Sequence, residues 1–167
     1  FEPRYRAMVA DALEADRTIG MTLLKPGAEE GGEAPAIHCI GTAGEIVESE
    51  ALADGRYNIL LEARFRFRVL EERAPDPYRV ASVEEIRTVP LPEAGEGERI
   101  VASATALYGE VARALDLPPL PGEQVSPERL ASEMALRLRY APPELQALLE
   151  TDSLASRFEA LRSRMRE

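Results

Sequence analysis

The sequence has few of the residues on which catalytic and metal sites are usually built. Its 167 residues include one cysteine, Cys39, and one histidine, His38. A single cysteine excludes an intrachain disulfide and, with no secretory segment in sight, favours a cytoplasmic protein. A single histidine argues against a Ser-His-Asp triad or a multi-histidine zinc site. Because adjacent strand residues point to opposite faces, His38 and Cys39 should not share a metal; we expect a surface or half-buried histidine and a buried thiol.

Several known motifs are also missing. The sequence has no GxxxxGK[ST] phosphate loop, no GxSxG elbow and no HExxH helix. No apolar run approaches the ~18 residues that a membrane helix needs. We therefore predict no enzyme activity, no cofactor, no metal and no membrane span.

Acidic residues outnumber basic ones, 30 to 20, which gives a formal net charge of −10. Such a charge repels phosphate backbones and anionic membranes, so nonspecific attraction to either is not expected. Lys25 is the only lysine. The chain also opens on Phe1 rather than methionine, so we expect it to begin inside a longer protein.

The organising stretch of the sequence is residues 43–86. Asp54-Gly55 favours a tight turn between two apolar runs. After it, apolar residues alternate with polar ones, which predicts antiparallel strands with one buried face. A second break at 74–77 leads into another alternating segment. Three long strands of this kind are expected to close into a small barrel, because closure removes exposed edges.

The rest of the chain predicts a helix, two more strands and then a helical region. We expect a helix over 2–16, a strand over 18–24, a solvated loop over 26–35 and a strand over 37–52. Glycines at 41 and 44 in that strand predict a bend or a close backbone approach.

After residue 92 the spacing of the apolar residues becomes helical. Helices are expected over 98–116, from Ser126-Pro127, from Pro142-Pro143, and after a cap at Thr151 or Asp152. The predicted fold class is α+β, with a β-rich lobe over 1–92 and a helical lobe over 93–167.

Arg64, Arg66 and Arg68 are candidate anion contacts, because alternation would place three guanidinium groups on one strand face. The alternative is cross-strand pairing with Glu45, Glu48 or Glu84. The interleaved Phe65 and Phe67 would be exposed in a nucleic-acid reader, but strict alternation favours the core. Glu48 and Glu50 share a strand face, as a solvated surface or, less simply, as a hydrolase pair.

Four blocks of the sequence resemble the N-terminal substrate-recognition domain of Lon proteases. They are FEPRYRAMVADAL at 1–13, TIGMTLLKPG at 18–27, CIGTAGEIVESEALADGRYNILLEARFRFRVLEE at 39–72 and PYRVASVEEI at 77–86. The segment PPELQALLETDSLASRFEAL at 142–161 resembles the end of that domain. The family usually has a glycine near the position of Ala63, which is one departure.

The resemblance implies a PUA-like β pseudo-barrel followed by a C-terminal α-helical bundle. It implies a domain that binds unfolded protein segments for an attached ATPase and protease. No ATPase or protease part is present in these 167 residues, so the resemblance does not imply proteolysis. In the family, a strand and a Pro-Gly turn precede the segment that matches Phe1 onward; a barrel without them would expose an edge.

The leading hypothesis is therefore a non-catalytic module that binds unfolded or extended polypeptide, with a protease or chaperone as a candidate partner. Its candidate contact residues lie beside the 26–36 loop: Met21, Leu23, Leu24 and Ile37. The alternative is a PUA-like RNA-binding domain, by fold analogy and with a basic patch at Arg64–Arg68. An enzyme that uses a carboxylate cluster ranks last, since no motif supports it.

Overall fold

A computed structural model describes residues 3–27, 35–73, 77–122 and 125–167. The chain divides into two compact units, Phe1–Arg87 and Thr88–Glu167. We call them the β unit and the helical unit. The predicted boundary between the β-rich and helical lobes, after residue 92, lies five residues beyond this division. The elements are α1 (Pro3–Glu14), β1 (Thr18–Met21), β2 (Ile40–Ala51), β3 (Tyr57–Glu72), β4 (Ala81–Ile86), α2 (Glu96–Leu115), α3 (Pro127–Arg137), α4 (Pro142–Glu150) and α5 (Leu154–Arg164).

The β unit is an antiparallel meander in the strand order β1-β2-β3-β4. Residues 43–86 pair as neighbouring strands, which confirms that prediction. Gly55 has φ 78° in the β2–β3 turn, and the backbone N–H of Arg56 donates to Asp54 Oδ1 at 3.1 Å. That hydrogen bond is the main reason why the pKa of Asp54 lies below its usual value. Within the described residues β1 and β4 are the two edges of the sheet.

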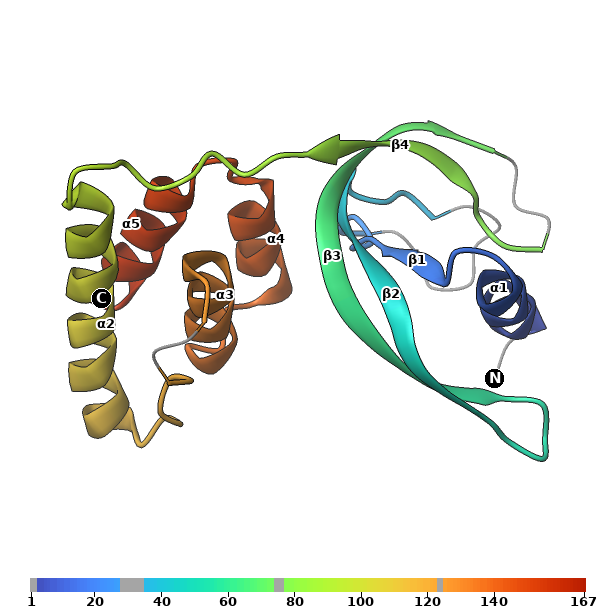
Figure 1. Ribbon diagram of the computed structural model, residues 1–167, viewed down its shortest axis with the longest axis horizontal. Coiled ribbons are helices and arrows are strands. Elements are labelled where there is room, and N and C mark those ends of the chain that lie inside the picture. Colours follow the sequence, from blue (N-terminus) through green and yellow to red (C-terminus); the bar gives the residue numbers. More distant parts are fainter. Residues whose placement is uncertain (1–2, 28–34, 74–76, 123–124) are drawn as a thin grey trace. The chain divides into compact units, whose positions relative to one another are not determined.

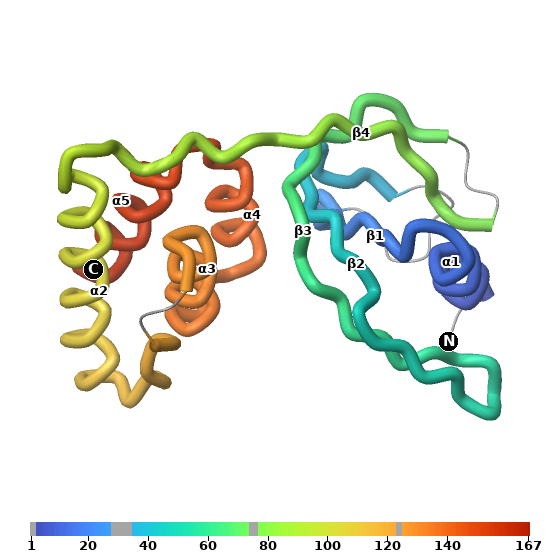
Figure 2. Tube along the Cα trace, viewed as in Figure 1, coloured from blue at the N-terminus to red at the C-terminus, as the bar shows by residue number. Residues whose placement is uncertain are grey.

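The β2–β3 hairpin is longer than its neighbours, so part of it is a two-stranded ribbon. β1 pairs only with Thr42–Glu45 of β2, and β4 pairs only with Arg66–Glu72 of β3. Figure 2 shows the hairpin continuing past both of these strands to its turn. Register shifts interrupt the hairpin between Ala43 and Gly44 and between Ile46 and Glu48.

Helix α1 covers the concave side of the curved hairpin (Figure 1). The buried core there consists of Val9, Ala12, Ile19 and Ile46, and side chains from β3 pack around it. These β3 residues are Tyr57, Ile59 and Leu61, the apolar half of the predicted alternation. The apolar face of β3, which its period-two alternation creates, therefore packs against the apolar face of α1.

Gly41 shows why a glycine is needed inside β2. A Cβ built there would lie 2.4 Å from the carbonyl oxygen of Met21 and 2.8 Å from the ring of Phe67. The predicted close backbone approach is therefore present, because no side chain fits between β1 and the Phe67 ring.

The helical unit is built around a larger apolar core. Its largest fully buried side chains are Tyr108, Met134, Leu154, Phe158 and Leu161. Ser126 caps α3 by accepting from the N–H of Arg129 at 3.3 Å, with Pro127 at the first helical position, as predicted. The last helix is present as predicted, but its predicted cap was wrong: Ser153 accepts from the N–H of Ser156, whereas Thr151 ends α4.

Val89 is bonded to the turn between α4 and α5. Its N–H donates to the carbonyl of Asp152 at 2.9 Å, and its own carbonyl accepts from the N–H of Leu154 at 3.0 Å. The two segments form a parallel bridge between Val89 and Ser153. Residues ahead of α2 are thus part of the helical unit.

Candidate functional site

The four apolar residues predicted as polypeptide contacts gather around one end of the β1–β2 pair. β1 ends at Met21, earlier than predicted, and β2 begins only at Ile40. Between them Leu24 and Ile37 form an isolated antiparallel bridge. The N–H of His38 donates to the carbonyl of Leu23 at 2.8 Å, and the N–H of Lys25 donates to Ala36 at 2.8 Å. Most of the intervening predicted loop, residues 28–34, lies outside the described residues.

We call Met21, Leu23, Leu24 and Ile37 the β1 end patch. Met21 has 57% of its surface exposed at the end of an edge strand, whereas the other three are half-buried. An extended chain beside β1 could use the strand's outer backbone edge for hydrogen bonds and Met21 for apolar contact. The geometry therefore offers both elements of strand-addition binding.

The segment before β4 is fastened to the same part of the unit. The Tyr78 hydroxyl donates to Asp11 Oδ2 of α1 at 2.6 Å, and this bond raises the pKa of Tyr78. The Arg79 guanidinium donates to the carbonyl of Pro35 and lies 3.2 Å from the Glu72 carboxylate. No local pattern in the sequence signals the bonds from Tyr78 to Asp11 and from Arg79 to Pro35, since their partners are 67 and 44 residues apart.

The three arginines of β3 do not form one exposed basic face. Arg64 donates to Glu45 at 2.8 Å and lies 3.3 Å from Glu62, so the predicted pairing with Glu45 is confirmed. Arg66 is only 8% exposed, and Arg68 lies opposite Glu84 in the β3–β4 ladder. A register shift at Arg64 breaks the alternation on which a common face depends. An anion contact stays a prediction, and nothing in this arrangement favours RNA.

The aromatic and sulfur residues correct one expectation and confirm another. Phe67 is buried and Phe65 is half-buried, as expected of core residues. Cys39 is exposed, so the predicted buried thiol was wrong. Cys39 lies just before β2, where its carbonyl accepts from Val69, and its side chain is left outside the small core.

Within the described residues, no three His, Cys, Asp or Glu side chains are grouped closely enough to bind a metal ion. Glu50 is exposed and accepts from the Asn58 amide at 3.0 Å, on the solvated side of the hairpin.

Comparison with known proteins places this fold. The family model described as the ATP-dependent protease La (LON) substrate-binding domain matches residues 1–167. The chain belongs to the Lon substrate-binding domain family. The part of Lon that it matches is the substrate-binding module and not the catalytic domain.

The curated relatives that match this chain are named Lon proteases. The chain is 29% identical to Lon protease 2 of Myxococcus xanthus over 158 residues, which cover 92% of the chain and 19% of that protein. It is 33% identical to the Lon protease of Phenylobacterium zucineum over 133 residues, covering 74% of the chain and 16% of that protein. The chain thus spans about a fifth of the length of the curated relatives it matches.

Solved Lon N-terminal structures share the fold. A Lon N-terminal domain protein from Xanthomonas campestris matches with a TM-score of 0.68 at 22% identity, over 98% of this chain and 85% of that one. The N-terminal domain of a Mycobacterium avium complex Lon protease matches with a TM-score of 0.64 at 18% identity, over 100% and 87%. The predicted α+β class is confirmed. Among the described residues, the helices are too short or too polar to cross a bilayer.

Proposed function

We propose that this chain is a non-catalytic module that binds unfolded or extended polypeptide segments. The family match over the whole chain supports this, because the matched domain is described as substrate-binding. The module would present bound segments to a protease or chaperone partner, in the same chain or another. The β1 end patch is the proposed contact surface.

The observation that carries the proposal is the exposed Met21 on β1, which pairs on one side only among the described residues. Met21 is 57% exposed, although burying such a side chain is worth about 1.5–3 kcal/mol. Beside it, two backbone hydrogen bonds between residues 23–25 and 36–38 form the bridge that holds Leu23, Leu24 and Ile37. A partner strand beside β1 could bury Met21 without a change in the unit's own pairing.

The test is a titration of the isotope-labelled chain with a reduced and alkylated, permanently unfolded polypeptide. Chemical-shift changes are expected over the described residues 18–25 and 35–40. Met21→Ser should weaken binding about tenfold, because apolar contact area is lost. The matched control is Leu115→Ser in α2, a leucine that is 65% exposed in the helical unit. The proposal fails if residues 18–40 show no change, or if both variants weaken binding equally.

A further inference from the structure

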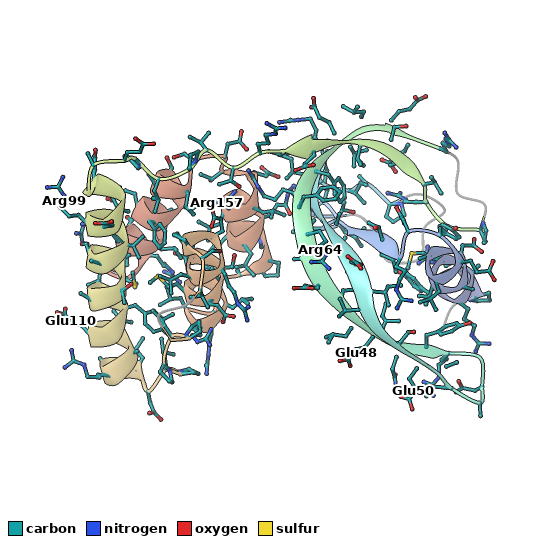
Figure 3. The ribbon with its side chains drawn as sticks, in the orientation of Figure 1. Glu48, Glu50, Arg64, Arg99, Glu110 and Arg157 are labelled. Atoms are coloured by element: carbon teal, nitrogen blue, oxygen red, sulfur yellow. The ribbon has the colours of Figure 1, made fainter. Side chains whose placement is uncertain are left out.

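A second feature of the β unit is the outer side of the β2–β3 ribbon. One side of the ribbon packs on α1 through Tyr57, Ile59 and Leu61. The opposite side carries their alternating neighbours and the residues paired with those. We call this surface the outer hairpin face; it consists of Glu45, Val47, Glu48, Glu50, Asn58, Leu60, Glu62 and Arg64. Figure 3 shows Glu48 and Glu50 on the side of the hairpin away from α1.

The centre of the outer hairpin face is apolar. Leu60 is 53% exposed and lies opposite Glu48 in the ladder, and Val47 is 40% exposed at the adjoining register shift. An exposed leucine and valine side by side in a ribbon are a place where apolar contact with a partner would stabilise binding.

The rim of this face is acidic and only partly neutralised. It carries four carboxylates, and its one cation, Arg64, already pairs with Glu45 and Glu62. Among the described contacts, Glu50 accepts from the neutral amide of Asn58. Within the described residues Glu48 has no ion-pair partner. An occupant with basic side chains would meet unpaired negative charge here, while a second copy of this face, or a nucleic acid, would be repelled.

The backbone of β3 gives a further possible contact for an extended ligand. Because β4 stops pairing at Arg66, β3 from Tyr57 to Phe65 has no second strand neighbour among the described residues. An extended segment could continue the line of β4 along this edge, with alternate side chains over the outer hairpin face.

We propose that the outer hairpin face binds extended polypeptide segments in which basic residues alternate with apolar ones. Because successive side chains of a strand point to opposite faces, the basic side chains would all lie over the outer hairpin face, and the apolar ones would point to the other side of the ribbon. The basic side chains would place their charges at Glu48 and Glu50 and their aliphatic stems against Leu60 and Val47. The inference extends the proposed function, because it takes an extended polypeptide as the ligand and adds a second surface with a stated chemical preference.

The experiment uses three fluorescent octapeptides, (Lys-Val)4, (Ser-Val)4 and (Glu-Val)4, with the 167-residue chain at low salt. Anisotropy should show binding of the Lys-Val peptide, weaker binding of the Ser-Val peptide and none of the Glu-Val peptide. Added salt should weaken Lys-Val binding, since the rim charges are exposed. In the labelled chain, shift changes are expected at 47–50 and 58–62. Equal binding of all three peptides would overturn the preference.

Variants separate this surface from the β1 end patch. The double variant E48Q/E50Q should weaken Lys-Val binding about tenfold, roughly threefold for each exposed charge, and Leu60→Ser should weaken it by a similar factor. The control is Glu110→Gln, an exposed carboxylate on α2 (Figure 3), which should leave binding unchanged. All three changes are at exposed positions, and an unaltered melting temperature verifies the fold.

Each result has a distinct meaning. If Glu110→Gln weakens binding as much as E48Q/E50Q, net charge alone attracts the peptide and the inference is wrong. If Met21→Ser abolishes Lys-Val binding while Leu60→Ser does not, the β1 end patch is the single site; the proposed function then stands and this inference fails. If Leu60→Ser only removes self-association in sedimentation, the face is a dimer contact and the inference also fails.

Discussion

The two units place their large apolar side chains differently. Among the residues that the structure describes, five of the six largest fully buried side chains belong to the helical unit, and Ile46 belongs to the β unit. The exposed large hydrophobic residues in the same described ranges show the reverse, with seven of ten in the β unit: Tyr5, Met21, Val47, Leu60, Leu70, Val80 and Val83. The helical unit is thus organised by side-chain packing, and the β unit by strand pairing around a small core.

This contrast bears on function. A strand can be held by backbone hydrogen bonds on one side while its apolar side chains and second edge stay open. A helix has no spare backbone groups in its middle, so its stability in a bundle comes from burying its apolar face. The β unit can therefore stay folded with apolar residues exposed, and both proposed binding surfaces lie in this unit.

The largest expected effect is a loss of stability in the helical unit. Phe158→Ala removes a fully buried ring from the core of the helical unit and should lower its free energy of unfolding by about 3–5 kcal/mol. Thermal melting followed by residue-resolved NMR should show the helical unit losing structure first. If signals from 3–87 disappear at the same temperature, the two units unfold as one and the comparison of separate cores is wrong.

The next largest effect is a loss of stability in the β unit. Gly41→Ala forces a Cβ against the Met21 carbonyl and the Phe67 ring, so β1 and β2 must separate. We expect a loss of about 1–3 kcal/mol, as for other overpacked sites, measured by denaturant unfolding. Gly109→Ala in α2 is the matched control. A Cβ there meets nothing within 4 Å, so this change should stabilise the helix by about 0.5–1 kcal/mol. If both substitutions change the free energy of unfolding in the same direction, the proposed difference in packing at the two glycines is wrong.

A smaller effect tests how the last helix begins. Ser153→Ala removes the side-chain acceptor at the N-terminus of α5 and should cost about 1 kcal/mol. Ser132→Ala is the control, because the Ser132 hydroxyl only bonds the Glu128 carbonyl within α3. Chemical denaturation should rank the two variants clearly. A cost at Ser132 equal to that at Ser153 would argue against the cap.

The smallest effect at neutral pH concerns Tyr140 in the helical unit. Burial raises its pKa to about 12, above the usual value of about 10. Between these values the unfolded chain loses the proton and the folded chain keeps it, so stability is complete below pH 10 and falls as pH rises toward 12. Tyr140→Phe should change little at pH 7, since this hydroxyl has no hydrogen-bond partner among the described residues.

Melting temperatures measured from pH 8 to pH 12 check this. The wild-type chain should lose more stability over that range than Tyr140→Phe does. Identical slopes would mean that the Tyr140 hydroxyl ionises equally in both states. The shift at Tyr78 has another cause, its bond to Asp11, and gives a comparison in the β unit.

The sequence predicted most of the secondary structure because its signals there are local. The Asp54-Gly55 turn, the alternation around Ile59 and Leu61, and the Ser126-Pro127 helix start each depend on a few adjacent residues. The family followed from short blocks that resemble Lon.

Side-chain surroundings were predicted less well because they depend on register and on distant segments. The shift at Arg64 separates it from Arg66, so three arginines that alternate in sequence do not share one environment. Cys39 is exposed because its backbone, not its side chain, is held against β3. For the candidate site, the sequence indicated four residues near one loop, but the bridge from Leu24 to Ile37 depends on backbone pairing that no local pattern reveals.

The bridge at Val89 sets where the helical unit can be cut. A fragment that starts at residue 93 would leave behind Val89, and with it both backbone hydrogen bonds to the α4–α5 turn. The Asp152 carbonyl and the Leu154 amide would then need water in place of protein, just where the last helix begins. A fragment of this unit for binding or folding work should therefore start at Thr88, because the extended segment before α2 stabilises the start of α5 and does more than connect the two units.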